Sequence, residues 1–328
     1  MADDSMYPAD GMSRNYKDST RTETKPNGGE NEGSADNKPR IRHIHQTVLS
    51  SPTTDFIRNT IMPTLDVPGA ILSYEVTGSG RYLLLIPGGG GTGHSLRNVR
   101  TLLANHYSVI TYDRRGHSKS LLTGEQDYEH RLDTDADDAA LLLQHVAKGE
   151  ASYVLGSSSG AIVARTLLMR HAELIEKVVL HEPPLVRALP DDERVVQETN
   201  LKNLYNTYRK KGHVSAMKVF GEIYIAPEEA ELLGMAPAEN PYTHGNLQYW
   251  FERELLYPVT DVGYDELSRL KDKIIMVDSA IGKDLPPAKI SQAMAAKLDL
   301  QLITMPGGHV GYVTHPQEFA DSLTSLLG

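Results

Sequence analysis

From about residue 64, short apolar runs alternate with longer stretches in which apolar residues recur at helical spacing. Several of the short runs are continuously apolar, which is typical of strands buried on both faces of a parallel sheet. We predict strands at 64–67, 71–76, 82–86, 107–112, 153–155, 177–180, 274–277 and 301–305. We predict helices at 95–104, 133–147, 161–171, 287–297 and 316–327. This alternation predicts an α/β fold with a mostly parallel central sheet and helices on both faces.

The alternation is interrupted once, between about residues 185 and 265, where the pattern is mainly helical. The insertion follows a strand, so it leaves the sheet at the edge where α/β proteins bind ligands and can fold over that edge as a helical cap. We therefore divide the chain into a polar tail (1–48), a first core part (49–184), a cap insertion (185–265) and a second core part (266–328).

The tail differs in composition from the rest of the chain. Its first 40 residues contain no Ile, Leu, Val, Phe or Trp. Such a segment buries too little apolar surface to order itself, so we predict that it is disordered. It also lacks the basic start and apolar centre of a signal peptide, which favours a cytoplasmic protein.

Composition narrows the classes of function. The chain has no cysteine, which excludes disulfides, thiolate metal sites and a cysteine nucleophile. Its formal net charge of −10 argues against nucleic acid or an anionic membrane as the main partner. No apolar stretch approaches the length of a membrane span. The sequence does not decide between a monomer and a homodimer.

Two patterns could suggest a metal site. His43 and His45 lie one residue apart just beyond the tail's polar stretch, but two histidines on a loop rarely bind a metal by themselves. Four aspartates gather at 133–138, yet the loop glycine and terminal glutamate of an EF-hand are missing. Acidic residues at a helix N-terminus need no ion to explain them. We expect neither a metal nor a cofactor.

The most informative stretch is G-x-S-x-G at residues 156–160, between a predicted strand and a predicted helix. A strand, a tight turn and a helix with serine at the apex form the context of a nucleophile elbow. Glycines permit the sharp bend, and the helix N-terminus favours negative charge beside Ser158. The same letters also occur in flexible polar loops, so the interpretation depends on the partners that other loops supply.

Those partners are expected on loops that follow other strands. His309 comes after the last strand behind two glycines and is the candidate base. The backbone N–H of Ser159, together with that of Gly89 in the glycine-rich loop after 82–86, is the candidate oxyanion hole. Three further histidines lie on loops of the same edge, and one of them could contact substrate: His94, His117 and His181.

The glycine-rich loop has a competing interpretation. Gly88, Gly90 and Gly93 spell G-x-G-x-x-G between a strand and a helix, and Asp113 ends the next strand, where a dinucleotide-binding fold places its ribose acid. Consecutive glycines satisfy many patterns by chance, however. A dinucleotide-binding oxidoreductase would also leave the serine motif and His309 unexplained, so we rank it lower.

The chain from about residue 64 to 327 resembles enzymes of the α/β-hydrolase fold. Residues 112–118 are similar to the Y-D-x-R-G-x-G-x-S stretch of that family, although the second glycine is missing. A narrower similarity is to fungal zearalenone-type lactonases and related bacterial hydrolases. It rests on G-x-S-S-G-A at 156–161, H-E-x-P at 181–184 and P-G-x-H at 306–309.

The resemblance implies a carboxylate that orients His309. Many α/β-hydrolases carry this acid after the seventh strand, where Asp284 stands in this chain. The lactonase-like group carries a glutamate after the sixth strand, which corresponds to Glu182. We favour Glu182 and keep Asp284 as the alternative, with capping of the following helix as its other role.

The expected function is that of a cofactor-independent serine hydrolase, with Ser158, His309 and Glu182 as the triad. The expected partner is a small-molecule ester or lactone, medium-sized, apolar and of polyketide type. Trp250, the single tryptophan, is predicted either to line the substrate pocket or to lie in the core of the cap. The alternatives are an epoxide or C–C bond hydrolase on the same fold and a non-catalytic small-molecule receptor.

Overall fold

The computed structural model describes residues 62–234 and 240–328. The tail predicted at 1–48 and the pair His43 and His45 therefore lie outside the described residues. The described strands form one sheet in the order β1-β2-β4-β3-β6-β7-β8-β9, with β5 paired to β2. Their bounds are β1 Thr64–Val67, β2 Ala70–Gly78, β3 Tyr82–Ile86, β4 Ser108–Tyr112, β5 Leu121–Leu122, β6 Ser152–Ser157, β7 Ile175–His181, β8 Ile274–Ser279 and β9 Leu302–Met305.

Most of the sheet is parallel. β4, β3, β6, β7, β8 and β9 run in one direction, whereas β2 pairs antiparallel with β1, β4 and β5. The register brings strand ends level in two pairs, because Ser157 lies opposite His181 and Ser279 lies opposite Met305. β8 ends two residues beyond Val277, the residue opposite His181. Loops that leave these ends therefore meet at one edge of the sheet.

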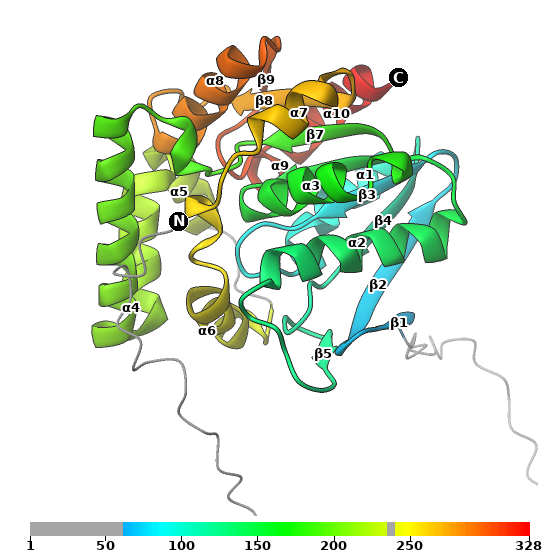
Figure 1. Cartoon of the computed structure of the whole chain (residues 1–328), viewed down its shortest axis with the longest axis horizontal. Helices are drawn as coiled ribbons and strands as arrows, with labels where there is room; N and C mark the ends of the chain where they lie inside the picture. The colour runs from blue at the N-terminus through cyan, green and yellow to red at the C-terminus, as the bar shows by residue number, and fades with distance from the viewer. Residues whose placement is uncertain (1–61, 235–239) are drawn as a thin grey trace, which may run out of the picture. The chain divides into compact units, whose positions relative to one another are not determined.

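Helices cover both faces of the sheet, and β3 shows why. Leu83 and Leu85 belong to the core under α1 (Arg97–Leu103) and α10 (Pro316–Leu327). Leu84 and Ile86 point to the other face, under α2 (Arg131–Ala147), α3 (Ser159–Arg170) and α8 (Pro286–Leu298). A strand buried on both faces needs apolar side chains at every position, which is the continuous apolar pattern of 82–86. Figure 1 shows α2 and α3 side by side across their face.

The segment between β7 and β8 forms a helical insertion, which begins after η5 (Val186–Ala188). It contains α4 (Asp191–Tyr224), α5 (Pro227–Gly234), α6 (Thr243–Arg253), η6 (Tyr257–Val259) and α7 (Tyr264–Arg269), before η7 (Lys271–Lys273) leads into β8. Gly212 interrupts α4, since its backbone angles (φ 79, ψ 172) are not helical. In Figure 1, α4 and α6 lie beside one end of the sheet, at the left of the view.

The structure confirms the predicted α/β class and nearly every predicted element, with small differences at the ends. The helix predicted at 95–104 begins as the 3-10 turn η3 (Gly93–Leu96) before α1. Three elements that were not predicted are too short to show a periodic pattern: η4 (Ala172–Leu174), β5 and α9 (Gly311–Thr314). None of the described helices combines the length and the apolar composition that a bilayer crossing requires.

Candidate active site

Ser158 occupies the sharp turn between β6 and α3. Its backbone angles (φ 56, ψ −128) lie in a region that residues with a side chain rarely adopt. A Cβ atom on Gly156 would lie 2.4 Å from the carbonyl oxygen of Gly160, and one on Gly160 would lie 2.3 Å from that of Ile86. Both glycines are therefore required by the close packing of strand, turn and helix, which is the geometry expected of a nucleophile elbow.

Three side chains from three strand ends converge at this turn. The Oγ of Ser158 lies 3.0 Å from Nε2 of His309, and Nδ1 of His309 lies 2.7 Å from Oε2 of Glu182. An ionised carboxylate only accepts hydrogen bonds, so Nδ1 carries the proton and a neutral imidazole leaves Nε2 free to accept from the Ser158 hydroxyl. The structure thus brings together the predicted nucleophile, base and acid in hydrogen-bonded order.

Glu182 is the candidate acid that reaches His309. Its second oxygen, Oε1, accepts a hydrogen bond of 3.0 Å from the backbone N–H of Ser279. Burial would raise the pKa of Glu182, but the hydrogen bond and charge of His309 hold it below its ordinary value, so the carboxylate is ionised at neutral pH. Asp284, the alternative acid, lies on an exposed turn ahead of α8.

A second imidazole lies behind the triad. The rings of His181 and His309 are stacked, with centroids 6.3 Å apart. Nδ1 of His181 lies 2.9 Å from Ser157 Oγ, and its Nε2 lies 3.2 Å from Ser279 Oγ. Burial lowers the pKa of His181 to about 4, so this ring is neutral at pH 7. His181 therefore supports the strand ends from within and does not line the pockets around Ser158.

The other two histidines named above also lie away from those pockets. His117 is buried with its ring edge-on to that of Tyr249, at a centroid distance of 5.1 Å. Burial lowers the pKa of His117 well below its ordinary value, and the charge of Arg114 lowers it further. His94 is exposed and lines a different cavity. Neither His94 nor His117 is among the residues that line the pockets around Ser158.

The loop after β3 passes directly over the serine. A Cβ atom on Gly88 would lie 3.2 Å from the Cβ of Ser158, and Gly89 lines the same pocket as Ser158 and His309. Ser159 is the first residue of α3, where a backbone N–H has no acceptor within its own helix. The N–H groups of Gly89 and Ser159 belong to the two segments that flank Ser158, and their role as oxyanion donors stays a prediction.

Arg114 fixes the orientation of that loop, a role that was not predicted from the sequence. The Arg114 guanidinium, fully buried, donates a hydrogen bond of 3.0 Å to the carbonyl oxygen of Gly88. This carbonyl and the N–H of Gly89 are the two ends of one planar peptide group, so holding the oxygen sets the direction of the N–H. Arg114 lies within the motif at 112–118, and that motif is the sequence signal that could have identified it.

Asp133 lies in the first turn of α2, as expected of an acidic residue at a helix N-terminus. Two of the other aspartates at 133–138 have a different role, because they are buried ion-pair partners. Asp135 lies 3.1 Å from Arg114, and Asp138 lies 2.6 Å from Arg115. Within residues 62–234 and 240–328, no three His, Asp or Glu side chains are grouped so that they could hold a metal ion.

Two cavities meet at Ser158 and His309. The wider one, of about 310 Å³, extends toward α4, α5 and α6, and its wall includes Met217, Leu233 and Leu247. The narrower one, of about 40 Å³, is lined by side chains such as Val186, Leu204 and Ile290. Trp250 and Phe220 border both cavities. Apolar side chains therefore line most of both cavities beside the serine.

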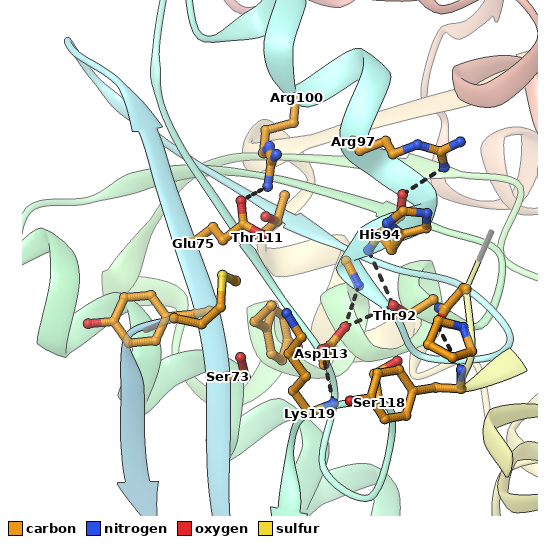
Figure 2. A pocket seen from close by; sticks show the side chains of 17 residues that line it. Ser73, Glu75, Thr92, His94, Arg97, Arg100, Thr111, Asp113, Ser118 and Lys119 are labelled. Carbon is orange, nitrogen blue, oxygen red and sulfur yellow. Dashed lines mark hydrogen bonds and ion pairs between the residues drawn. The ribbon is translucent and has the colours of Figure 1, made fainter. Parts of the chain in front are cut away.

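A further cavity, of about 460 Å³, lies apart from the triad, and Figure 2 shows its polar and charged wall. Asp113, the candidate ribose acid of the dinucleotide interpretation, belongs to this wall. Its carboxylate accepts hydrogen bonds from Thr92 Oγ1 (2.9 Å), Gly93 N–H (3.0 Å) and Lys119 N–H (3.2 Å), as Figure 2 shows. Asp113 thus joins the glycine-rich loop to the turn after β4, which explains its position without a nucleotide.

Comparisons with known proteins bear on the family and the fold of the chain. The family model of the alpha/beta hydrolase family matches residues 83–322. The uncharacterized hydrolase YraK of Bacillus subtilis (strain 168) is 34% identical over 271 residues, which cover 80% of this chain and 95% of YraK.

Solved structures show the same fold at lower identity. A thermophilic esterase from Thermogutta terrifontis has a TM-score of 0.61 at 20% identity, covering 81% of this chain and 96% of its own. The enol-lactonase from Burkholderia xenovorans LB400 has a TM-score of 0.57 at 18% identity, covering 81% of this chain and 99% of its own. These two likenesses concern the fold alone.

Proposed function

Because this chain belongs to the alpha/beta hydrolase family and its relatives are hydrolases, we propose that it is a serine hydrolase that cleaves ester or lactone bonds through an acyl-enzyme. The observation that carries the proposal is the hydrogen-bonded series from Ser158 through His309 to Glu182, with distances of 3.0 and 2.7 Å. A nucleophile, a base and a buried carboxylate in this order are the groups that acyl transfer needs.

In the proposed reaction, a lone pair of Ser158 Oγ attacks the carbonyl carbon while Nε2 of His309 takes the hydroxyl proton. The carbonyl π electrons move onto the oxygen, where the N–H groups of Gly89 and Ser159 stabilise the negative charge. When the tetrahedral intermediate collapses, the bond to the leaving oxygen breaks and His309 returns its proton to that oxygen. A water molecule then repeats both steps on the acyl-enzyme and releases the acid.

Glu182 supports both halves of this cycle. Its ionised carboxylate holds the Nδ1–H of His309, which selects the tautomer that can accept the Ser158 proton. It also stabilises the imidazolium that forms in each step. The backbone N–H of Ser279 holds the other carboxylate oxygen, so the group keeps its orientation through the reaction.

The cavities support an apolar, medium-sized substrate with the scissile carbonyl at their junction. One apolar part would lie in the wider cavity and a shorter one in the narrower cavity. Trp250 borders both, and among the described residues its buried indole N–H has no hydrogen-bond partner. A substrate oxygen is the natural acceptor for that donor, because an unsatisfied buried N–H is costly. Trp250 therefore acts as a substrate-binding residue in this proposal.

A fluorophosphonate probe tests the proposal. Intact-mass analysis should show one adduct, peptide mapping should place it on Ser158, and Ser158→Ala should remove both the adduct and the hydrolysis of p-nitrophenyl esters. On the scale of other serine hydrolases, kcat should fall by about 10⁶. Ester hydrolysis that persists in Ser158→Ala would contradict the proposal. Tight binding of esters without turnover in the unmodified protein would favour a receptor instead.

A further inference from the structure

We propose that Glu229, on helix α5 of the insertion, is a positioning residue for the catalytic histidine. The insertion then completes the catalytic machinery in addition to forming walls of the pocket. This inference rests on the proposed role of His309 as the base. It assigns a function to a buried carboxylate that the reaction described above does not use.

Glu229 contacts the chain on both sides of His309. Its side chain is fully buried, and Oε1 accepts hydrogen bonds from Gly308 N–H (3.1 Å), Val310 N–H (3.2 Å) and the Thr314 hydroxyl (3.1 Å). Oε2 lies 3.2 Å from the same Val310 nitrogen. Hydrogen bonds to an ionised acceptor are about twice as strong as those between neutral groups. The carboxylate therefore restrains the backbone immediately before and after the histidine.

The position of Glu229 explains why residue 308 is a glycine. A Cβ atom on residue 308 would lie 2.4 Å from Oε2 of Glu229, a residue 79 positions earlier in the chain. Gly308 is not among the positions with positive φ, so its backbone conformation would accept alanine. The glycine before His309 thus makes room for the carboxylate, which indicates that the two groups act together.

The same short helix also faces the substrate pocket. Ala230 and Leu233 line the wider cavity together with His309 and Val310. Glu229 points instead into the histidine loop, so α5 (Pro227–Gly234) holds the base with one side chain and shapes the pocket with others. A shift of about 1 Å in a catalytic group can cost on the order of a hundredfold in rate, so losing this restraint is expected to slow turnover.

Glu229→Gln tests the proposal, with Glu228→Gln as the matched control. The control makes the same change one residue earlier on α5, on an exposed side chain. With p-nitrophenyl acetate and p-nitrophenyl octanoate, Glu229→Gln should lower kcat by about tenfold to a hundredfold for both esters, with KM within about twofold. Fluorophosphonate labelling should slow by the same factor. Glu228→Gln should leave all three rates within about twofold.

The choice of two esters separates positioning from pocket shape. If Glu229 only shaped the wall of the wider cavity, the loss would be confined to the octanoate and would appear mainly in KM. That result, or unchanged labelling in Glu229→Gln, would overturn the proposal while leaving the serine-hydrolase function intact. An unmodified protein that the fluorophosphonate does not label would instead overturn the proposed function itself.

A double-mutant cycle adds a test that does not depend on one variant. Gly308→Ala should lower kcat in the wild-type background, because the new Cβ displaces the Glu229 carboxylate. In a Glu229→Ala background the clash is gone, so Gly308→Ala should cost less than about twofold more. Additive losses would overturn the coupling. If Glu229→Gln and Glu229→Ala fail to fold by circular dichroism, Thr314→Val removes one donor to the carboxylate. It should then lower kcat by about threefold on both esters, and an unchanged kcat would overturn the proposal.

Discussion

Arg114 and Glu254 form a fully buried ion pair, in which a guanidinium nitrogen lies 2.6 Å from Oε2 of the glutamate. Arg114 follows β4 in the core, whereas Glu254 follows α6 in the helical insertion. Burial would lower the pKa of Arg114, but Glu254 and Asp135 raise it above its ordinary value, so the guanidinium stays charged. Buried pairs gain little net stability, because both ions lose their water. The pair instead matters because it holds Arg114 in place, and Arg114 also donates a hydrogen bond to the Gly88 carbonyl.

Arg114→Lys should therefore lower kcat more than it raises KM. Lysine keeps the charge, but its single ammonium group lacks the fork that reaches the Gly88 carbonyl and two carboxylates together. The Gly88–Gly89 peptide would lose its anchor, and we expect about a tenfold loss in kcat, below the 10²–10³ of a deleted oxyanion donor. Steady-state kinetics with p-nitrophenyl esters measures the loss.

Arg115→Lys is the control for that variant. Arg115 makes two hydrogen bonds to Asp138 and one to the Pro68 carbonyl, but none to the Gly88 carbonyl. Urea unfolding should show a loss of stability in both variants, whereas kcat should stay within about threefold in Arg115→Lys. Equal losses of kcat in the two variants would show that Arg114 acts through stability alone.

The two candidate acids should respond differently to the same change. Glu182→Gln keeps the shape of the side chain but removes the charge beside Nδ1 of His309, so kcat should fall by about 10⁴, as in other triads. Asp284→Asn alters an exposed turn and should cost less than about twofold. Melting temperatures of the two variants control for folding. The reverse order of losses would assign the acid to Asp284.

The stability of the protein should depend on His181 between pH 7 and 5. The pKa of His181 is about 4 in the folded state and near 6.5 when unfolded. As pH falls below 6.5, the unfolded chain binds a proton that the folded protein does not, so stability is lost, by about 2 kcal/mol at pH 5. Below the pKa of His181 in the folded protein, the loss of stability no longer increases as the pH falls.

Urea unfolding of the wild type and His181→Gln at pH 7 and pH 5 measures this contribution. Groups that do not interact with His181 titrate equally in both proteins and cancel in the comparison. The stability difference between the two pH values should be smaller in the variant by about 2 kcal/mol, whatever its stability at pH 7. An identical difference in both proteins would contradict the neutral buried state of His181.

Trp250 should report the occupation of the pocket. It is the single tryptophan of the chain, it is buried, and it borders both cavities at Ser158. Fluorophosphonate labelling should therefore shift or quench the tryptophan emission at the rate of adduct formation. Ser158→Ala treated in the same way should show no change. If the emission does not change when the adduct forms, Trp250 lies in the core of the insertion and does not line the pocket, which was the alternative prediction.

Much of the fold could be predicted from the sequence, because the burial of a strand or helix leaves a pattern of apolar positions in its own residues. A strand such as β3 needs apolar side chains at every position, and a helix needs them at helical spacing, so both patterns survive without tertiary information. Ser158 and His309 could be predicted as candidate site residues for a related reason. Both stand beside glycines directly after strands, and the ends of parallel strands meet at one edge wherever the strands lie in the sheet.

The tertiary structure decided which distant side chains meet. Glu182 and Asp284 both follow strands near His309, and only the register and the positive φ of Glu182 (47°) select the one that reaches Nδ1. Glu229 carries no local signal, since a glutamate on a helix is an ordinary surface residue in most sequences. Arg114 lies in the motif at 112–118, but that motif does not say which groups the guanidinium meets. Their partners, Gly308 and Glu254, come from other segments of the chain. Sequence periodicity records which face of an element is buried, whereas hydrogen bonds across the fold depend on positions that only packing sets.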